Sequence, residues 1–240
     1  IYSYVRSIGS VKAETVNIEN DNLEEFYARV EDSPVRCPDK VSEGEMIKLI
    51  EQAKSEGESL GGSFEVGTLG IPPGLGSHIS WERKLDGQIA VALMSIPAIK
   101  AVEIGDGIAN AGELGSRVHD QIRYQEEQGL YRDINRAGGI EGGISNGETI
   151  YARAYMKPIP TLYKPLISVN TTDWKEEKAQ VERSDICAVP AAAVVGEAMM
   201  AFVLARAFRE QFGGESIEQV EQACSSYREY LNKVWQWKRI

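Results

Sequence analysis

The sequence contains few cysteines, few histidines and no excess of positive charge. Its 240 residues include 3 cysteines and 2 histidines, and the formal net charge is −10. An odd cysteine count without a Cys-x-x-Cys spacing indicates no disulfide framework and favours a reducing, cytoplasmic setting. The negative charge argues against a general binder of nucleic acid or of acidic membranes, although a few local donors can still hold a small anion. We expect no metal ion.

Targeting and membrane signals are also scarce. No run of eighteen or more apolar residues predicts a membrane span, and no secretory leader is evident at the start. The first residue is isoleucine rather than methionine, so we expect the chain to begin inside a longer protein or to have been processed. Its hydrophobic content of 42% is enough for a sizeable core.

The stretch from Val181 to Ala205 joins a polar, extended segment to one long apolar helix. Side chains two apart in an extended segment point to the same face, so Arg183 and Asp185 should project together. The helix over Ala191–Phe208 is apolar on nearly every side, which predicts burial of most of its circumference. Two interpretations of the charged pair remain open: a structural ion pair, or a site carboxylate kept ionised by the neighbouring guanidinium.

Periodicity and turn residues predict a mixture of helices and strands. Strands are expected over residues 1–8, 62–70, 99–104, 148–157 and 166–169, and helices over 22–30, 42–57, 82–95, 191–208 and 216–237. Ser42 with Glu45, and Ser216 with Gln219, have the spacing of capping boxes. The order favours an α+β fold, with antiparallel sheets packed against central helices, and we expect residues 1–240 to form a single domain.

Two further stretches could carry chemistry. Gly139–Gly147 is rich in glycine, which lets backbone N–H groups approach a ligand, but an ordinary hairpin loop has the same composition. It opens a strand rather than a helix, so it lacks the context of a dinucleotide fingerprint. Lys157–Thr161 offers a cation and a hydroxyl on a stiff backbone, which suits an anionic group, although it could equally be a strand end with a solvated lysine. Cys187 is expected to be a buried small hydrophobe rather than a nucleophile.

These stretches together resemble the chorismate synthases. GGIEGGISNGETIYARAYMKPIPTL is similar to the glycine-rich region of that family, and RSDICAVPAAAVVGEAMMAFVLA is similar to its C-terminal signature. SPVRCPD, GIPPGLGSH, RKLD and LMSIPAIKAVEIGDG agree in order and spacing. The resemblance extends from about Ser33 to Gly213 and implies an incomplete β-α-β sandwich.

The resemblance also implies a reaction, a cofactor and an assembly. Chorismate synthases convert 5-enolpyruvylshikimate-3-phosphate to chorismate and phosphate by an anti elimination in the shikimate pathway, and they require reduced FMN without net redox change. Family members are homotetramers, and the resemblance leaves open whether NADPH or a partner protein supplies the reducing equivalents. The implied catalytic residue is Asp185, and the implied FMN contacts are Pro97, Ala98, Gly142, Lys157, Pro158, Ile159, Pro160, Thr161 and Arg183.

The sequence departs from the family pattern in what it lacks. The two family histidines that act as acids, and the arginine-rich stretch that binds the substrate's anionic groups, have no counterpart here. His78 and His119 do not lie in the family's histidine motifs, and we expect both to be surface or structural residues. The chain therefore resembles only the C-terminal part of the family, and we expect it to be inactive alone. Two alternatives remain: a non-catalytic flavin-binding or interaction module, and a helical protein whose final helix makes an oligomer contact.

Overall fold

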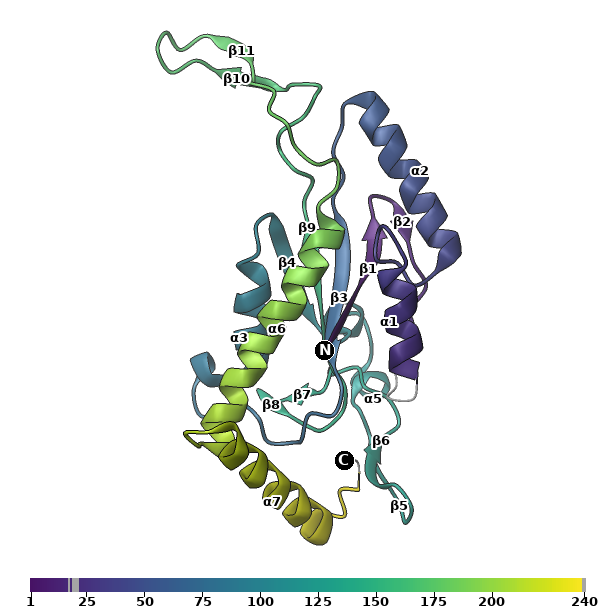
Figure 1. Ribbon diagram of the computed structural model, residues 1–240, viewed down its shortest axis with the longest axis vertical. Helices are drawn as coiled ribbons and strands as arrows, with labels where there is room; N and C mark the ends of the chain where they lie inside the picture. Colours follow the sequence, from purple (N-terminus) through teal and green to yellow (C-terminus); the bar gives the residue numbers. More distant parts are fainter. Residues whose placement is uncertain (17, 19–21, 239–240) are drawn as a thin grey trace.

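An antiparallel five-stranded sheet forms the centre of the molecule in the computed structural model, which describes residues 1–16, 18 and 22–238 (Figure 1). The strand order is β2-β1-β3-β9-β4, and each neighbouring pair is antiparallel. The strands are β1 (Tyr2–Ile8), β2 (Val11–Lys12), β3 (Gly62–Thr68), β4 (Ile99–Ile104), β5 (Ile122–Gln125), β6 (Gly129–Arg132), β7 (Ile140–Glu141), β8 (Ile144–Ser145), β9 (Ile150–Met156), β10 (Ile167–Val169) and β11 (Glu176–Lys178).

Helices cover the sheet and extend below it. They are α1 (Leu23–Glu31), α2 (Lys40–Glu56), α3 (Leu85–Met94), α4 (Gly107–Asn110), α5 (Gly115–Val118), α6 (Val189–Phe212) and α7 (Ile217–Trp235), with a 3-10 turn, η2 (Trp81–Arg83), before α3. α3 and α6 pack on one face of the sheet, whereas Phe26 and Val30 of α1 pack against Tyr2 and Tyr4 of β1. The predicted α+β class is confirmed.

Strand β9 shows how the sequence pattern divides the two faces of the sheet. Ile150, Ala152, Ala154 and Met156 are all buried and belong to the core shared with α3 and α6. The alternate residues of β9, including Arg153, point to the opposite face, as the period of two requires. The predicted alternation over 148–157 is therefore confirmed.

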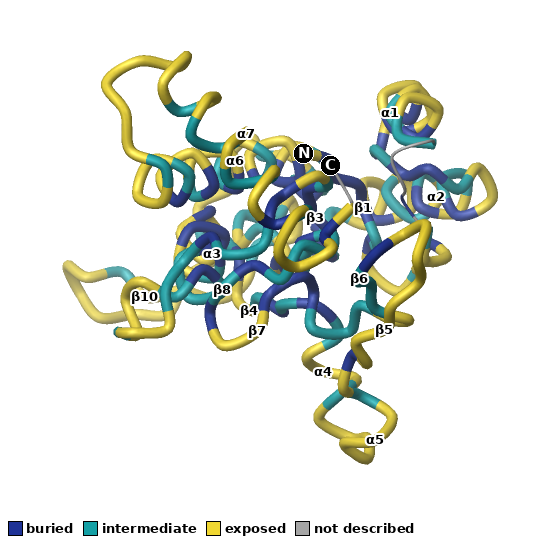
Figure 2. The backbone as a smooth tube through the Cα atoms, turned by 90° about the horizontal axis from the view of Figure 1, so that it is seen from below, coloured by how far each residue is buried: buried dark blue, intermediate teal, exposed yellow. Residues whose placement is uncertain are grey.

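Close approach of α6 to the sheet depends on a glycine in the middle of the helix. A Cβ added at Gly196 would lie 2.6 Å from the Phe64 ring, so only glycine allows this contact without movement of the ring. Buried residues follow β1, β3 and the inner faces of the helices in Figure 2, whereas α5 is exposed.

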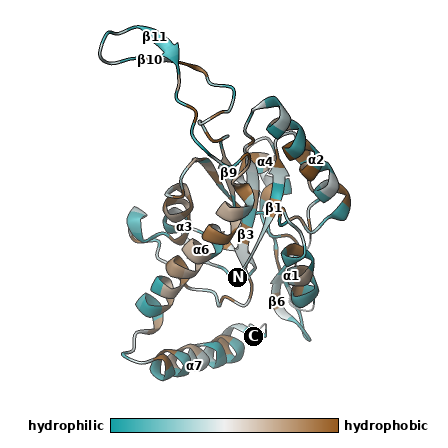
Figure 3. Ribbon diagram, turned by 45° about the horizontal axis from the view of Figure 1, so that its top comes forward, coloured by the Kyte–Doolittle hydropathy of each residue, from teal (hydrophilic) through white to brown (hydrophobic). Residues whose placement is uncertain are grey.

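The outer face of α6 corrects one expectation from the sequence. Burial of most of the helix circumference is wrong: Phe202 is 75% exposed, and Val194 and Val195 are nearly half exposed. Packing against β1, β3 and α3 covers only one side of α6, which is mostly apolar apart from Glu197 and its polar C-terminal turns (Figure 3). By length and composition alone, α6 could cross a membrane, which the search for apolar runs did not anticipate. Its packing on the sheet is that of a core helix.

One capping prediction is confirmed and one is wrong. Ser216 caps α7 by accepting a hydrogen bond from the Gln219 N–H. α2 begins at Lys40, and Asp39 rather than Ser42 caps it by accepting from the N–H groups of Val41 and Ser42.

Candidate functional site

The end of β9 is where the structure gathers most of the predicted site residues. The Lys157 N–H donates to the Ala98 carbonyl oxygen at 2.9 Å, which joins the Lys157–Thr161 segment to the turn between α3 and β4. Pro97 lies in the same turn and is exposed. Ala98 has φ +67°, a left-handed conformation that is uncommon for a residue with a side chain. The turn is therefore held in a special shape directly beside Lys157.

The loop Ser59–Gly61, which the sequence analysis missed, packs against the Lys157–Thr161 segment. A Cβ added at Gly61 would overlap the backbone of Met156–Pro158, and the Ser59 hydroxyl donates to the Ile159 carbonyl oxygen at 2.6 Å. The Gly61-Gly62 pair at the start of a strand was a usable signal, because glycine at such a position often marks close approach of another backbone.

The segment that carries Arg183 and Asp185 lies against the same loop. The Ser184 hydroxyl donates to the Thr161 carbonyl oxygen at 3.1 Å, and the Leu60 N–H donates to the Ile186 carbonyl oxygen at 2.7 Å. Arg183 and Asp185, which precede and follow Ser184 in the sequence, are both exposed. Within residues 1–16, 18 and 22–238 they form no ion pair with each other or with other residues, so the structural ion-pair interpretation has no support here.

The β10–β11 arm connects the two site segments. It leaves the body after Lys164, whose N–H donates to the Gly57 carbonyl oxygen, and it returns at the Arg183 segment. Its strands pair with each other, and all of their residues are exposed. Figure 1 shows the arm projecting from the end of the sheet. The arm thus has both of its ends at the candidate site.

Gly142 does not join this group. It lies at the turn of the β7–β8 hairpin with φ +62°, and a Cβ added to it would meet no other atom within 4 Å. The hairpin is attached to the first residue of α3, because the Leu85 N–H donates to the Gly143 carbonyl oxygen at 2.9 Å. Pro97 and Ala98 follow the last residue of α3, so a helix of 10 residues, about 15 Å long, separates the two places.

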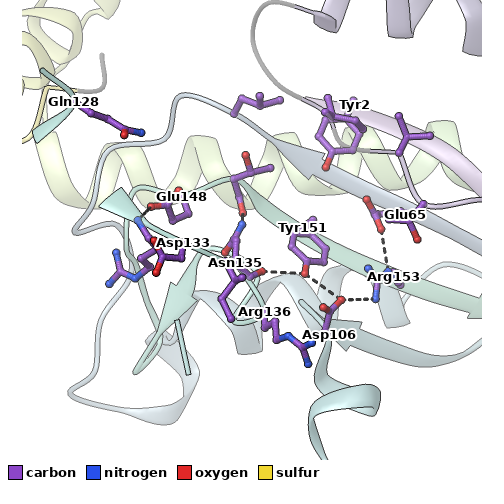
Figure 4. A pocket seen from close by; sticks show the side chains of 17 residues that line it. Tyr2, Glu65, Asp106, Gln128, Asp133, Asn135, Arg136, Glu148, Tyr151 and Arg153 are labelled. Atoms are coloured by element: carbon purple, nitrogen blue, oxygen red, sulfur yellow. Dashed lines mark hydrogen bonds and ion pairs between the residues drawn. The ribbon is translucent and has the colours of Figure 1, made fainter. Parts of the chain in front are cut away.

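A separate cavity of about 780 Å³ lies against the other face of the sheet and contains none of the predicted site residues (Figure 4). Its charged groups bind one another: Arg153 contacts Glu65 at 2.9 Å and Asp106 at 3.0 Å. The Tyr151 hydroxyl lies 3.1 Å from an Asp106 carboxylate oxygen and 3.0 Å from the Asn135 carbonyl oxygen, and its single proton is shared between these two acceptors. Burial and then the Asp106 charge raise the pKa of Tyr151. We interpret the charged residues that line this cavity as a structural network of ion pairs.

The remaining reactive residues are accounted for by their surroundings. Cys187 is partly buried against the core rather than fully buried as expected. Burial raises the pKa of its thiol, which opposes formation of a nucleophilic thiolate. His78 and His119 are both exposed.

Comparison with known proteins gives a consistent result. The family model described as "Chorismate synthase" matches residues 1–208. Chorismate synthase of Syntrophomonas wolfei is 61% identical over 240 residues, which are 100% of this chain and 61% of the relative. Chorismate synthase of Desulforamulus reducens is 52% identical over 234 residues, 98% of this chain and 60% of the relative.

A solved structure agrees with the sequence comparison. The structure titled "Crystal Structure of Chorismate Synthase" superposes with a TM-score of 0.80 and 42% identity, over 96% of this chain and 63% of that chain. The chain thus spans about 60% of the length of the curated relatives it matches. The matched residues, the fold and the identities together show that this chain belongs to the chorismate synthase family.

Proposed function

We propose that this chain is one part of an enzyme that eliminates phosphate from 5-enolpyruvylshikimate-3-phosphate to give chorismate, with reduced FMN as cofactor. The observation that supports it most is the meeting of three segments at the end of β9. They bring the Lys157 and Arg183 side chains, both exposed, beside a rigid backbone. Residues 1–240 would then be part of a single, larger domain.

The donor set at this edge fits an anionic cofactor. Lys157 and Arg183 would hold the phosphate group of FMN, because charge-assisted hydrogen bonds to phosphate are the strong ones. Thr161 adds a hydroxyl, while Pro97, Ala98 and Pro158–Pro160 would form a fixed wall. When bound, reduced FMN would supply a transient electron that weakens the bond between the substrate carbon and the phosphate oxygen. Gly142 would contact the cofactor only from the far end of α3.

Asp185 is the proposed catalytic carboxylate. It is exposed beside Arg183, and a carboxylate in this position can assist removal of the proton that leaves during the elimination. The NADPH-dependent or partner-dependent supply of electrons, the homotetrameric assembly and the cytoplasmic location are proposed from family membership.

The alternative is a non-catalytic flavin-binding or interaction module on the same scaffold. Such a module would need Lys157 and Arg183 for the cofactor but would have no use for Asp185. The two proposals therefore differ in what a change at Asp185 does.

A chimeric enzyme tests the proposal. The matching residues of the Syntrophomonas wolfei chorismate synthase would be replaced by this chain, and phosphate release from the substrate would be measured with reduced FMN. We expect turnover in the chimera and a loss of about 100-fold or more in kcat for Asp185→Asn, the usual range for a proton-transfer group. Glu182→Gln, an exposed acid three residues earlier, is the matched control and should change kcat less than about twofold.

The contrary outcomes are distinct. Normal phosphate release by the Asp185→Asn chimera would overturn the catalytic assignment. A chimera that binds FMN in titrations but releases no phosphate, while the parent enzyme does, would favour the non-catalytic module.

A further inference from the structure

The C-terminal segment lies across three glycine turns that come from separate parts of the chain. α7 and residues 236–238 run beneath the β7–β8 hairpin and end beside β6 (Figure 1). This segment begins after residue 208, where the match to the family model stops. The function proposed above assigns it no role.

The first contact is between Tyr227 and the turn at Gly74. The Tyr227 hydroxyl donates to the Pro73 carbonyl oxygen at 3.0 Å, and a Cβ added at Gly74 would lie 2.6 Å from the same hydroxyl. Next to it, Arg228 donates to the Gly70 carbonyl oxygen at 3.0 Å. α7 therefore fixes the position of the 70–74 turn.

The second and third contacts come from the residues after α7. Gly129 (φ +74°) lies so close to the Gln236 carbonyl that a Cβ would overlap it, and the Leu130 N–H donates to that carbonyl oxygen at 3.2 Å. Trp237 is only 6% exposed. A Cβ added at Gly147 (φ +89°) would overlap the Cη2 and Cζ2 atoms of its indole ring.

Gly147 is the last glycine of the hairpin that carries Gly142. The base of this hairpin is closed by the Asn146 N–H, which donates to the Gly139 carbonyl oxygen at 2.9 Å. Ser145 ties the hairpin to the 70–75 turn, because the Gly74 N–H donates to its carbonyl oxygen at 2.9 Å. Trp237 therefore contacts the β7–β8 hairpin, and Tyr227 contacts the 70–75 turn that is hydrogen-bonded to it.

We propose that Trp237 is a positioning residue, which holds the β7–β8 hairpin so that Gly142 faces the cofactor from a fixed place. The inference rests on the proposed function, since Gly142 is a proposed FMN contact. Trp237 would act on the cofactor indirectly, through Gly147 and the hairpin. The indole ring packs where a Cβ of Gly147 would lie, and this contact sets the position of the hairpin.

Hydrogen exchange on the 240-residue chain tests the clamp without any flavin. We expect Trp237→Ala to speed amide exchange over residues 139–147 by about tenfold or more, because a local packing contact is lost. Trp235→Ala removes the same ring from the same helix end at a site that is 57% exposed, and it should leave that exchange unchanged. Trp237→Phe should restore most of the protection.

A double substitution checks the contact from the other side. Gly147→Ala should loosen the hairpin through both its overlap with the indole and its positive φ. Adding Trp237→Ala removes the overlap, so the double variant should lose less stability in urea unfolding than the two single losses add up to. Strict additivity, or unchanged exchange in Trp237→Ala, would overturn the clamp.

FMN titration of the Syntrophomonas chimera tests what the clamp is for. We expect Trp237→Ala to weaken FMN binding by about tenfold, with Trp235→Ala unchanged and Trp237→Phe close to the parent chimera. Faster exchange in the hairpin with unchanged FMN affinity would overturn the positioning role. A parent chimera that binds no FMN would instead overturn the proposed function, and the flavin part of this inference with it, while the exchange result would still decide the clamp.

Discussion

Arg153 shows how a single residue can hold one face of the sheet together. Its guanidinium lies 2.9 Å from Glu65, 3.6 Å from Glu103 and 3.0 Å from Asp106. Burial by itself would lower the pKa of Arg153, but the charges of and hydrogen bonds to Glu65 and Asp106 outweigh it and raise the pKa above the usual value. Arg153 therefore stays charged, and it compensates the buried carboxylates of Glu65 and Glu103 and the partly exposed carboxylate of Asp106.

Removing this guanidinium should be costly because its partners remain. We expect Arg153→Met to lower the free energy of unfolding by about 3 kcal/mol, the low end of the usual cost of breaking a buried pair, because Arg6 still lies 3.2 Å from Glu65. Arg206→Met is the matched control, since Arg206 forms an exposed pair with Glu210 on α6 and should cost about 0.5 kcal/mol or less. Urea unfolding followed by circular dichroism measures both. Equal losses in the two variants would show that the network does not stabilise the sheet.

Sequence patterns could not have identified this network or the cap of α2. Glu65 and Arg153 are 88 positions apart, and only the β3–β9 register places them opposite each other. At α2 two residues three positions apart, Asp39 and Ser42, had side chains suitable for a cap. The structure uses Asp39, whose pKa is lowered first by the Ser42 hydroxyl and then by the Ser42 N–H. Ser42 is therefore a donor to the capping residue rather than the cap itself.

At the scale of elements, apolar composition predicted helix α6 but not the side that is covered. Apart from Glu197 and the polar residues of its last turns, the sequence of α6 is apolar, and its periodicity does not mark one face for the sheet. The structure makes the choice through Gly196, which allows close contact with Phe64. β9 was easier to predict, because its alternation of apolar residues with charged and tyrosine residues is a direct consequence of one buried and one polar face.

The exposed face of α6 leads to a prediction about association. We expect Phe202→Ser to change the unfolding free energy by about 0.5 kcal/mol or less, as for other surface positions, and to reduce self-association of the chain. Met200→Ser, two residues earlier and only 1% exposed, should instead cost about 3 kcal/mol or more. Sedimentation velocity and urea unfolding measure the two effects. A large loss of stability in Phe202→Ser with no change in association would contradict the assignment of this face.

At the scale of the whole molecule, local sequence placed the site residues on elements, but contacts between distant segments decide which of them meet. Lys157 reaches Ala98 because β4 and β9 are neighbours in the sheet, and Ser184 reaches Thr161 because the β10–β11 arm returns to its starting point. Gly142 lies near the opposite end of α3, because its hairpin is attached to Leu85, the first residue of that helix. The supporting loop at Ser59–Gly61 was missed because its role is to pack, and no charged side chain marks it.

The chain by itself presents only one side of the proposed site, and this leads to the final prediction. Lys157, Arg183 and Asp185 are all exposed, and the chain spans about 60% of its relatives' length. Without a second wall, the two cations act on phosphate in water, where charge pairs contribute little. We therefore expect FMN to bind the 240-residue chain at least about tenfold more weakly than the chimera.

The same reasoning predicts no turnover by the chain alone. With reduced FMN and 5-enolpyruvylshikimate-3-phosphate, phosphate release should equal that of a control without protein, while the Syntrophomonas enzyme in the same assay provides the positive control. Asp185, Lys157 and Arg183 are all exposed to water in this structure, so the electrostatic stabilisation that a closed site provides is absent. Phosphate release well above the control would mean that the segments at the end of β9 form a sufficient catalytic site, and it would contradict the view that Asp185 needs a covered environment to act.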